Sequence, residues 1–219
     1  MNYIVPFVPH LFTKRTEDEA YIVAVTFRGV LGQTDFLDCI RNMTEDEFLS
    51  KAKAKLREIE NGPEMKRFHG SPGTLVTKYS ESGPKSFGKY LRRVLMAGAP
   101  FQPGLISCEY TFPEELTNSD TQDTPDLKLD CEQYIYILHA PVRFIANDYN
   151  SILEPGSSLI IKKNVRHGFS PAEKGKPKII SFQMDDKDSD AWGIVALSLQ
   201  FAGEKGAARI RRNSKHWSN

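Results

Sequence analysis

The hydrophobic and polar positions of the chain follow one pattern up to about residue 70 and another after it. In the first part, capping motifs precede apolar stretches and indicate helices. In the second part, short apolar runs alternate with turns rich in glycine and proline, which is typical of strands. We therefore expect a helical region over residues 1–70 and a mainly β domain with a C-terminal extension over residues 71–219.

Two capping boxes mark the predicted helices of the first region. Thr16-Glu-Asp-Glu19 precedes the apolar stretch from Ala20 to Phe27, where β-branched residues weaken the helical propensity. Thr44-Glu-Asp-Glu47 opens a second helix, which Asn61-Gly62-Pro63 brings to an end. A shorter helix capped by Thr34 or Asp35 is expected between them. Three short helices with a tight turn also raise the possibility of a DNA-binding helix-turn-helix. The second capped helix balances lysines against glutamates, so it offers no basic recognition face, and we favour a helical appendage.

Several short apolar runs predict the strands of the second region. Such runs, separated by turn residues, favour an antiparallel barrel or sandwich. The polar segment from Glu114 to Asp130 is expected to be a solvated loop. After Asp190 an apolar stretch leads into a basic end, which we interpret as a solvated helix end rather than a phosphate-binding patch. The predicted strands are Thr74–Tyr79, Leu105–Phe112, Gln133–Leu138, Val142–Ala146, Leu159–Ile161 and Lys178–Met184.

Composition and charge exclude several classes of protein. The 219 residues carry a formal net charge of +1, which gives no overall attraction to nucleic acid or to an anionic membrane. No apolar run approaches the roughly 20 residues of a membrane span, and the first residues lack the features of a signal peptide. The three cysteines, Cys39, Cys108 and Cys131, show no CxxC spacing. Reduced thiols in a cytoplasmic protein are therefore expected.

The stretch LEPGSSLIIKKNVRHGF, residues 153–169, contains the most specific motif of the chain. A proline–glycine turn precedes a short apolar strand, and His167 follows a second turn. The spacing from Gly156 through Lys162 and Asn164 to His167 resembles the second motif of the cupin superfamily, with lysine in place of proline and asparagine in place of glycine. Asparagine tolerates the left-handed conformation that glycine adopts. The first cupin motif ends in a glutamate, six residues and a glycine, and Glu132 to His139 has this spacing.

Within cupins, the chain is similar to the phosphonate-oxidising group. The segments that carry this resemblance lie within about residues 85 to 185 and read GLISCEYTF, EQYIYILHAPVRF, LEPGSSLIIKKNVRHGF and KPKIISFQM. The resemblance implies a cupin barrel, a double-stranded β-helix of the jelly-roll type, with an N-terminal α-helical appendage. It also implies a mononuclear non-haem Fe(II) centre that oxidises a small phosphonate or a similar anion.

Carried over residue by residue, the iron centre of that group is incomplete in this chain. Glu132 and His167 match two of its ligands. The first histidine, four residues before the glutamate, is replaced by Lys128, which as an ammonium cannot bind a metal and would pair with Glu132. Alternation along a strand puts Asp130 on the same face as Glu132, so Asp130 is the chemically reasonable third ligand nearby.

The resemblance also assigns substrate-binding and catalytic residues. Tyr90 corresponds to the tyrosine that holds the phosphonate in that group, and with Lys128 it is a candidate catalytic residue. Lys78 and Lys85 are expected to neutralise the anion. Tyr134, which shares the predicted ligand face, is expected to contact the substrate.

Three functions remain open at this stage. One is an Fe(II)-dependent oxygenase of a small anionic substrate. Another is a metal-free, non-catalytic cupin that acts as a ligand-binding or structural subunit, in which Lys128 and Glu132 are ion-paired. It would form a homo-oligomer or pair with a catalytic cupin chain that holds the complete ligand set. The third is a transcriptional regulator that combines a helix-turn-helix with a cupin. The charge distribution counts against it, because it does not favour a nucleic-acid partner.

Overall fold

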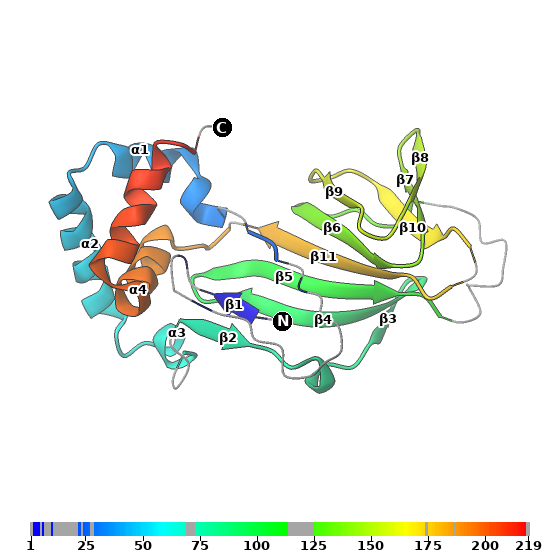
Figure 1. Cartoon of the computed structure of the whole chain (residues 1–219), viewed down its shortest axis with the longest axis horizontal. Helices are drawn as coiled ribbons and strands as arrows, with labels where there is room; N and C mark the ends of the chain where they lie inside the picture. Colours follow the sequence, from blue (N-terminus) through cyan, green and yellow to red (C-terminus); the bar gives the residue numbers. More distant parts are fainter. Residues whose placement is uncertain are drawn as a thin grey trace. The chain divides into compact units, whose positions relative to one another are not determined.

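The computed structural model describes residues 2–4, 6, 10, 22, 24–26, 29–68, 73–113, 125–173, 175–185 and 187–217. These residues form two units (Figure 1). The β unit comprises the described parts of Thr77–Ala99 and Pro103–Lys187. The helical unit comprises those of Asn2–Val76, Pro100–Gln102 and Asp188–Asn219.

The C-terminal residues belong to the helical unit, and this corrects the expected division at residue 70. The sequence predicts them as an extension of the β domain. The structure instead packs α4 (Ala191–Ser214) with the N-terminal helices α1 (Thr34–Arg41) and α2 (Glu45–Ile59). The reason is a matched apolar face, because α4 and the N-terminal helices share one buried cluster.

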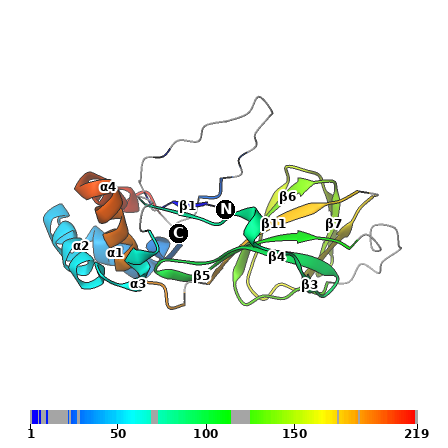
Figure 2. The same cartoon turned by 90° about the horizontal axis from the view of Figure 1, so that it is seen from below.

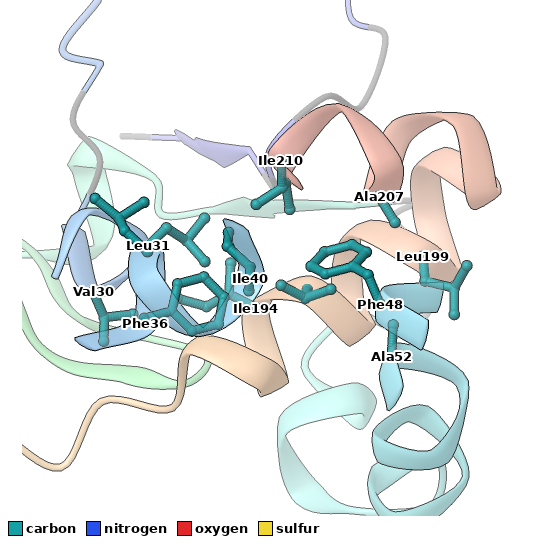
Figure 3. Packing of buried hydrophobic residues seen from close by; sticks show 12 residues of the cluster. Val30, Leu31, Phe36, Ile40, Phe48, Ala52, Ile194, Leu199, Ala207 and Ile210 are labelled. Atoms are coloured by element: carbon teal, nitrogen blue, oxygen red, sulfur yellow. The ribbon is translucent and has the colours of Figure 1, made fainter. Parts of the chain in front are cut away.

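The core of the helical unit is made of aliphatic and aromatic side chains from α1, α2, α4 and the 3₁₀ turn η1 (Gly29–Gly32). Figure 3 shows Phe36 and Phe48 among them. Both rings lie against Trp192, with centroids 5.6 and 5.5 Å away. The buried residues of this helical core are Val30, Leu31, Phe36, Leu37, Ile40, Phe48, Ala52, Ile194, Val195, Leu199, Ala207 and Ile210. The unit also contains the short helix α3 (Pro63–Lys66) and the paired strands β1 (Asn2–Ile4) and β2 (Thr74–Val76).

The capping box predicted for α2 is present. The Thr44 hydroxyl accepts the backbone N–H of Glu47 at 3.2 Å, and the Glu47 carboxylate accepts the backbone N–H of Thr44 at 2.7 Å. The shorter predicted helix is also confirmed, as α1, but its N-cap is Gln33 and not Thr34 or Asp35, and no side chain caps it. The helix predicted over residues 20–27 falls mostly outside the described residues, and Ile22, Ala24, Val25 and Thr26 carry no helix.

The basic C-terminal end of α4 contacts the end of α1. Arg211 donates to the backbone carbonyl of Met43 just after α1, with Nε at 2.7 Å. In return, Arg41 of α1 donates to the carbonyls of Ser214 and Trp217, each from Nη2 at 2.7 Å. Helix ends leave carbonyls without intrahelical partners, so these two arginines satisfy them reciprocally. Within α4, Gly203 has a φ of 67° and bends the helix.

The β unit is built from antiparallel strands. In Figure 2 they curve around a common interior. They are β3 (Lys85–Phe87), β4 (Tyr90–Ala99), β5 (Gln102–Thr111), β6 (Glu132–His139), β7 (Val142–Ala146), β8 (Tyr149–Leu153), β9 (Ser158–Ile161), β10 (His167–Pro171) and β11 (Lys178–Asp185). A 3₁₀ turn, η2 (Tyr79–Glu81), precedes them.

The order of the strands is that of a jelly roll. One sheet runs β3-β4-β5-β11-β6-β9 and the other runs β10-β7-β8. The segment at Leu127 pairs with His167 at the free edge of β10. We number the eight strands in chain order, with β5 as strand 1, the Leu127 segment as strand 2 and β11 as strand 8. The two sheets then have the orders 1-8-3-6 and 2-7-4-5, which is the arrangement that two Greek keys produce. The fold class expected from the sequence is confirmed, since strands dominate and helices accompany them.

Alternation along each strand separates a core face from an outer face. On β6, Gln133, Ile135 and Ile137 are buried, whereas Glu132, Tyr134 and Tyr136 point the other way and are partly exposed. The buried cluster of the unit is Tyr90, Cys108, Tyr110, Phe112, Leu127, Ile135, Ile137, Val142, Phe144, Ile161, Phe169 and Ile179. No helix among the described residues has the length and apolarity needed to cross a membrane.

Removing the cap of α2 gives a direct test of the helical unit. Thr44→Ala should lower the free energy of unfolding by about 0.5–2 kcal/mol, because the Glu47 N–H loses its acceptor. Urea denaturation followed by far-UV circular dichroism measures this change. Ser50→Ala, an exposed serine in the middle of α2, is the matched control and should leave the transition in place. Equal effects of both substitutions would contradict the cap.

Candidate functional site

His167 lies at the start of β10, and its side chain is buried in the β unit with 1% of the residue exposed. Its backbone N–H and C=O both pair with Leu127, at 2.8 Å each. Its ring Nδ1 lies 3.0 Å from the carbonyl oxygen of Val165, so Nδ1–H is the donor and Nε2 carries the lone pair. Nε2 is buried and has no hydrogen-bond partner among the described residues.

The surroundings of His167 favour the neutral imidazole. Burial lowers its pKa, and this outweighs the opposite effects of the Val165 carbonyl and the Asp126 carboxylate. Phe169 stands edge-on to the imidazole with ring centroids 5.9 Å apart, and Phe144 lies at 6.4 Å. His167 is therefore a buried acceptor at neutral pH, as a ligand-binding histidine would be.

Glu132 does not share a site with His167. Its carboxylate lies on the outer face of β6 and binds the Lys162 ammonium at 2.6 Å. Its neighbour Gln133 takes the core face instead, with 1% of the residue exposed. The sequence predicts Glu132 as an inward ligand, and this is corrected by the alternation of β6, which points it away from the buried cluster.

The other two residues predicted near the metal are also on the surface. Lys128 is exposed, and its expected pairing with Glu132 is replaced by that of Lys162. The Asp130 side chain is 74% exposed and lies 3.5 Å from the Lys187 ammonium. The structure therefore brings neither of them to His167. In the described part of the chain, no three histidine, cysteine, aspartate or glutamate side chains gather as a metal site would require.

The backbone conformation locates the two stretches that resemble cupin motifs. In the second motif, Asn164 adopts a φ of 65°, which is the left-handed conformation expected where asparagine replaces glycine. In the first motif, the left-handed residue is Ala140, with a φ of 53°. Six residues separate Ala140 from Gln133, which is the spacing of the first motif. The motif therefore runs from Gln133 to Ala140, one position later than the expected Glu132 to His139. The inward side chain is then an amide, and the residue four positions before it is Leu129.

A row of polar side chains crosses the core face of four neighbouring strands, and the sequence analysis did not identify it. Gln183 of β11 donates to the hydroxyl of Tyr110 on β5 at 3.1 Å. Gln133 of β6 donates to the hydroxyl of Ser181 on β11 at 3.3 Å. The Gln133 Oε1 atom is buried without a partner in the described chain. We call Arg92, Tyr110, Ser181, Gln183 and Gln133 the inner polar row.

The inner polar row stands at positions that alternation assigns to the core, where apolar residues are usual. Burial raises the pKa of Tyr110 to about 12, although the Arg92 guanidinium opposes this rise. Its hydroxyl therefore stays protonated at neutral pH. The signal in the sequence was the polar residue between apolar neighbours in the run KIISFQM, at Ser181 and Gln183.

Tyr90 is sealed inside the β unit. Its hydroxyl donates to Asp126 at 2.7 Å and accepts the backbone N–H of Phe169 at 3.0 Å. Only 1% of the residue is exposed, and burial raises the pKa of its hydroxyl far above the usual value. Its hydrogen bonds join β4 to β10 across the two sheets. Tyr90, the predicted phosphonate-binding tyrosine, therefore has a structural role in this unit.

The remaining predicted substrate residues lie apart from one another. Lys78 precedes η2 and pairs with Glu81 at 3.4 Å. Lys85 is exposed on β3. Tyr134 is on the outer face of β6, directly opposite Ile160 of β9. Of the three, only Lys85 shares a strand face with residues of the core, because Phe87 on the same strand packs against the buried cluster.

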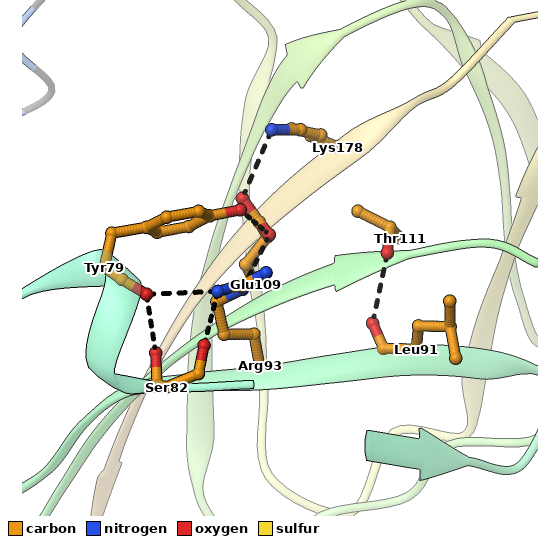
Figure 4. A network of polar contacts seen from close by, with 7 residues as sticks. All are labelled: Tyr79, Ser82, Leu91, Arg93, Glu109, Thr111 and Lys178. Atoms are coloured by element: carbon orange, nitrogen blue, oxygen red, sulfur yellow. Dashed lines mark hydrogen bonds and ion pairs between the residues drawn. The ribbon is translucent and has the colours of Figure 1, made fainter. Parts of the chain in front are cut away.

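A second polar cluster lies on the outer face of the same sheet (Figure 4). The Glu109 carboxylate accepts the Tyr79 hydroxyl at 2.7 Å and lies 3.6 Å from Arg93 Nε and 3.7 Å from Lys178 Nζ. The Arg93 guanidinium lies over the Tyr79 ring, 3.9 Å from its centroid, and donates to the carbonyls of Tyr79 and Ser82. The cluster holds η2 onto the sheet.

Several solved structures are similar to about half of this chain. Hydroxypropylphosphonic acid epoxidase from S. wedmorenis matches 51% of this chain at 18% identity with a TM-score of 0.45, and the match spans 60% of that protein. KdgF from Halomonas sp. matches 52% of this chain at 16% identity with a TM-score of 0.40, over 97% of its own length. An RmlC-like cupin from Shewanella frigidimarina NCIMB 400 matches 52% at 15% identity with a TM-score of 0.38, over 93% of its length.

No family model and no curated protein matches the sequence. At the low identities and TM-scores of the solved structures, the likeness says nothing of substrate or reaction. The chain resembles cupins, and its own strand order is that of a jelly roll.

The buried state of His167 predicts a loss of stability in acid. Unfolded histidine has a pKa of about 6.5, and the folded pKa is lower, so the unfolded state binds the proton first. Stability should therefore fall as the pH drops below about 6.5, by up to about 1.4 kcal/mol per pH unit from this residue. Urea denaturation between about pH 5 and pH 8, which brackets that pKa, measures how the free energy of unfolding changes with pH.

Two variants isolate this contribution. His167→Gln should flatten the pH dependence, whatever it does to stability at neutral pH. His139→Gln, at the exposed end of β6, is the control and should keep the wild-type slope. A His167→Gln protein with an unchanged slope would show that His167 titrates alike in both states.

Loss of the Glu109 charge should weaken the outer polar cluster. Glu109→Gln leaves two cations facing an amide and should cost about 1–3 kcal/mol of unfolding free energy. Glu81→Gln, which removes a largely exposed pair with Lys78, should change it by no more than about 0.5 kcal/mol. Denaturation of both variants in parallel tests the difference, and equal small effects would mean that the cluster does not stabilise the unit.

Proposed function

We propose that the β unit is a ligand-binding barrel without a glutamate–histidine iron centre, and that it takes a small polar molecule between its sheets. One observation carries the proposal. The inward position of the first motif holds Gln133, whose Oε1 is buried without a partner in the described chain, and His167 Nε2 is in the same state.

The donor set does not suit iron. A facial triad needs three protein donors, typically two imidazoles and a carboxylate. The positions that match the motifs carry Leu129, Gln133 and His167, so only the histidine remains as a metal donor. The carboxylates that the sequence offered, Glu132 and Asp130, are engaged with lysines at the surface. This supports the metal-free alternative over the oxygenase.

The open atoms favour a ligand that donates hydrogen bonds. Both Gln133 Oε1 and His167 Nε2 are acceptors. A buried acceptor without a partner costs about 1–3 kcal/mol, which a ligand hydroxyl or N–H group recovers on binding. A small polyhydroxy or amino compound has the matching chemistry.

The proposed role is binding rather than catalysis. The buried tyrosines on the core face, Tyr90 and Tyr110, have raised pKa values and are not poised to exchange protons at neutral pH. We propose that any oxidation is carried by a partner chain with a complete ligand set. The homo-oligomer or paired assembly and the cytoplasmic location stay predictions of the sequence.

Metal analysis separates this role from the oxygenase. Protein purified anaerobically with added Fe(II) should retain less than about a tenth of an equivalent, because no dedicated site is formed. Glu132→Ala and His167→Ala should leave this content unchanged. One equivalent of iron in the wild type that both substitutions remove would overturn the proposal and support the oxygenase.

Ligand binding gives the positive test. Hexoses, polyols and hydroxy acids are screened for a rise in the melting temperature of the whole chain. A compound that stabilises the wild type should lose its effect in Gln133→Leu, which fills the site with an apolar side chain. Tyr136→Leu, on the outer face of the same strand, is the control and should respond as the wild type does. A compound that acts equally on both variants binds elsewhere.

A further inference from the structure

In the described part of the β unit, the strands β3, β8 and β9 are each paired on one side only. Their partners are β4, β7 and β6, whereas the outer edge of β10 is taken by the Leu127 segment. A free edge presents backbone N–H and C=O groups that another chain can bind. Two of these strands also expose large apolar side chains, since Ile152 of β8 is 49% exposed and Ile160 of β9 is 55% exposed.

The backbone of β9 offers hydrogen-bonding groups on its free side. On the paired side, the Ile137 N–H of β6 donates to the carbonyl of Ser157 at 3.0 Å. Bonds to one neighbour recur at every second residue of an antiparallel ladder, so Leu159 also faces β6. Ser158 and Ile160 therefore direct their backbone groups to the free edge, where these groups have no partner in the described chain.

The flanking charges decide which free edge can pair with a second copy of itself. Two copies of a strand related by a two-fold axis run antiparallel, so the start of one lies beside the end of the other. Strand β8 lies between the exposed acids Asp148 and Glu154, which such pairing would bring together. Strand β3 has three residues and begins with the exposed cation Lys85, a feature that protects edges from pairing. Strand β9 follows Glu154 and precedes Lys162 and Lys163, so its self-pairing joins opposite charges.

The charges at the two ends of β9 are available for such a contact. Lys162 is bound to Glu132 at 2.6 Å. Glu154 and Lys163 are both exposed, and neither has an ion pair in the chain as far as the structure describes it. Between them, Ile160 lies on the outer face of the sheet, directly opposite Tyr134 of β6. An apolar centre with charges at its margin is the usual make-up of a protein interface.

We propose that β9 is the interface through which two copies of this chain pair, with their β9 strands antiparallel about a two-fold axis at Leu159. In this register, Ser158 of each copy lies opposite Ile160 of the other, and the two residues exchange backbone hydrogen bonds. The two Ile160 side chains become diagonal neighbours on the outer face. Glu154 of each copy comes close to Lys163 of the other. The six-stranded sheets of the two copies join into one.

The inference adds a surface and a symmetry to the homo-oligomer that the sequence predicts. Each copy has one β9 edge, so the two-fold pairing closes at two copies. The strand is four residues long, and its contact is small beside the roughly 1,200–2,000 Å² of stable complexes. We therefore expect a dissociation constant of about 1–100 μM.

Sedimentation velocity of the whole chain over this concentration range tests the pairing. The wild type should pass from one copy to two as its concentration rises. Ile160→Lys should raise the dissociation constant at least about tenfold, because two cations replace the apolar contact. Val76→Lys is the matched control, since Val76 of β2 is 60% exposed and lies in the helical unit. It should dimerise as the wild type does. A wild type that stays monomeric, or an Ile160→Lys protein that dimerises undiminished with native circular dichroism, would overturn the inference.

Charge exchange tests the antiparallel self-pairing. Glu154→Lys and Lys163→Glu should each weaken dimerisation by about tenfold, since each turns two symmetric attractions into repulsions. The double variant should recover the wild-type affinity. An equimolar mixture of the two single variants should also form dimers, because the lysines of one chain then meet the glutamates of the other. Weakening without recovery in the double variant and in the mixture would exclude this geometry.

Salt and the interior site give two further checks. Added salt should weaken the dimers of the wild type and of the double variant alike. Gln133→Leu changes an inward side chain of β6 and should leave dimerisation unchanged. Loss of dimerisation in Gln133→Leu would mean that the association depends on the barrel interior and would contradict pairing through β9. A purified chain that dimerises only after a different cupin chain is added would place that chain, and not a second copy, on the edge.

Discussion

Side chains on a strand alternate between two faces, and on β6 this alternation decides which chemical groups enter the barrel. Ile135 and Ile137 supply the apolar contacts that hold β6 on the core. Gln133 shares their face, and Glu132 is therefore held outside, where it meets Lys162. The burial of two isoleucines thus places an amide in the interior and a carboxylate in solvent, because a one-residue slip would expose both isoleucines.

The two units of the chain form their buried cores in different ways. The helical unit closes its core with segments from both ends of the sequence, and Arg41 and Arg211 exchange hydrogen bonds between the ends of α1 and α4. The β unit closes its core with consecutive strands and admits polar groups into it. In the described chain, Gln133 and His167 each keep one atom unpaired there. Such atoms lower stability, and proteins tolerate them where a ligand uses them.

Local signals predicted the local structure well. The capping box of α2 and the left-handed Asn164 depend on residues within a few positions of one another, so the sequence alone was sufficient. The position of α4 was not predictable in this way, because Arg41, with which its C-terminal end pairs, lies 173 residues before Ser214. Strand β4 was not predictable from the sequence either, since its run YLRRVLMAGA carries two charged residues and a glycine and shows little alternation.

The candidate site was predictable in part. The motif around His167 led to a buried imidazole, as expected. The resemblance to the first cupin motif assigns Glu132 to the inward face of β6, whereas the burial of the neighbouring residues assigns Gln133 to it. Ile135 and Ile137, set against Tyr134 and Tyr136, carried the information that the face of Gln133 points inward.

Arg92 and Arg93 are neighbours in the sequence that serve opposite sides of one strand. Arg93 is bound to Glu109 and the carbonyls beside Tyr79, so it fixes the rotation of β4 about its axis. Arg92 is held toward the interior as a result. A one-residue deletion in the Gly88–Lys89 turn would leave both arginines in place, because β4 also pairs with β5, and it would instead turn the opposite face of the edge strand β3 toward the interior. The length of that turn therefore decides which side chains of β3 share a face with Arg92.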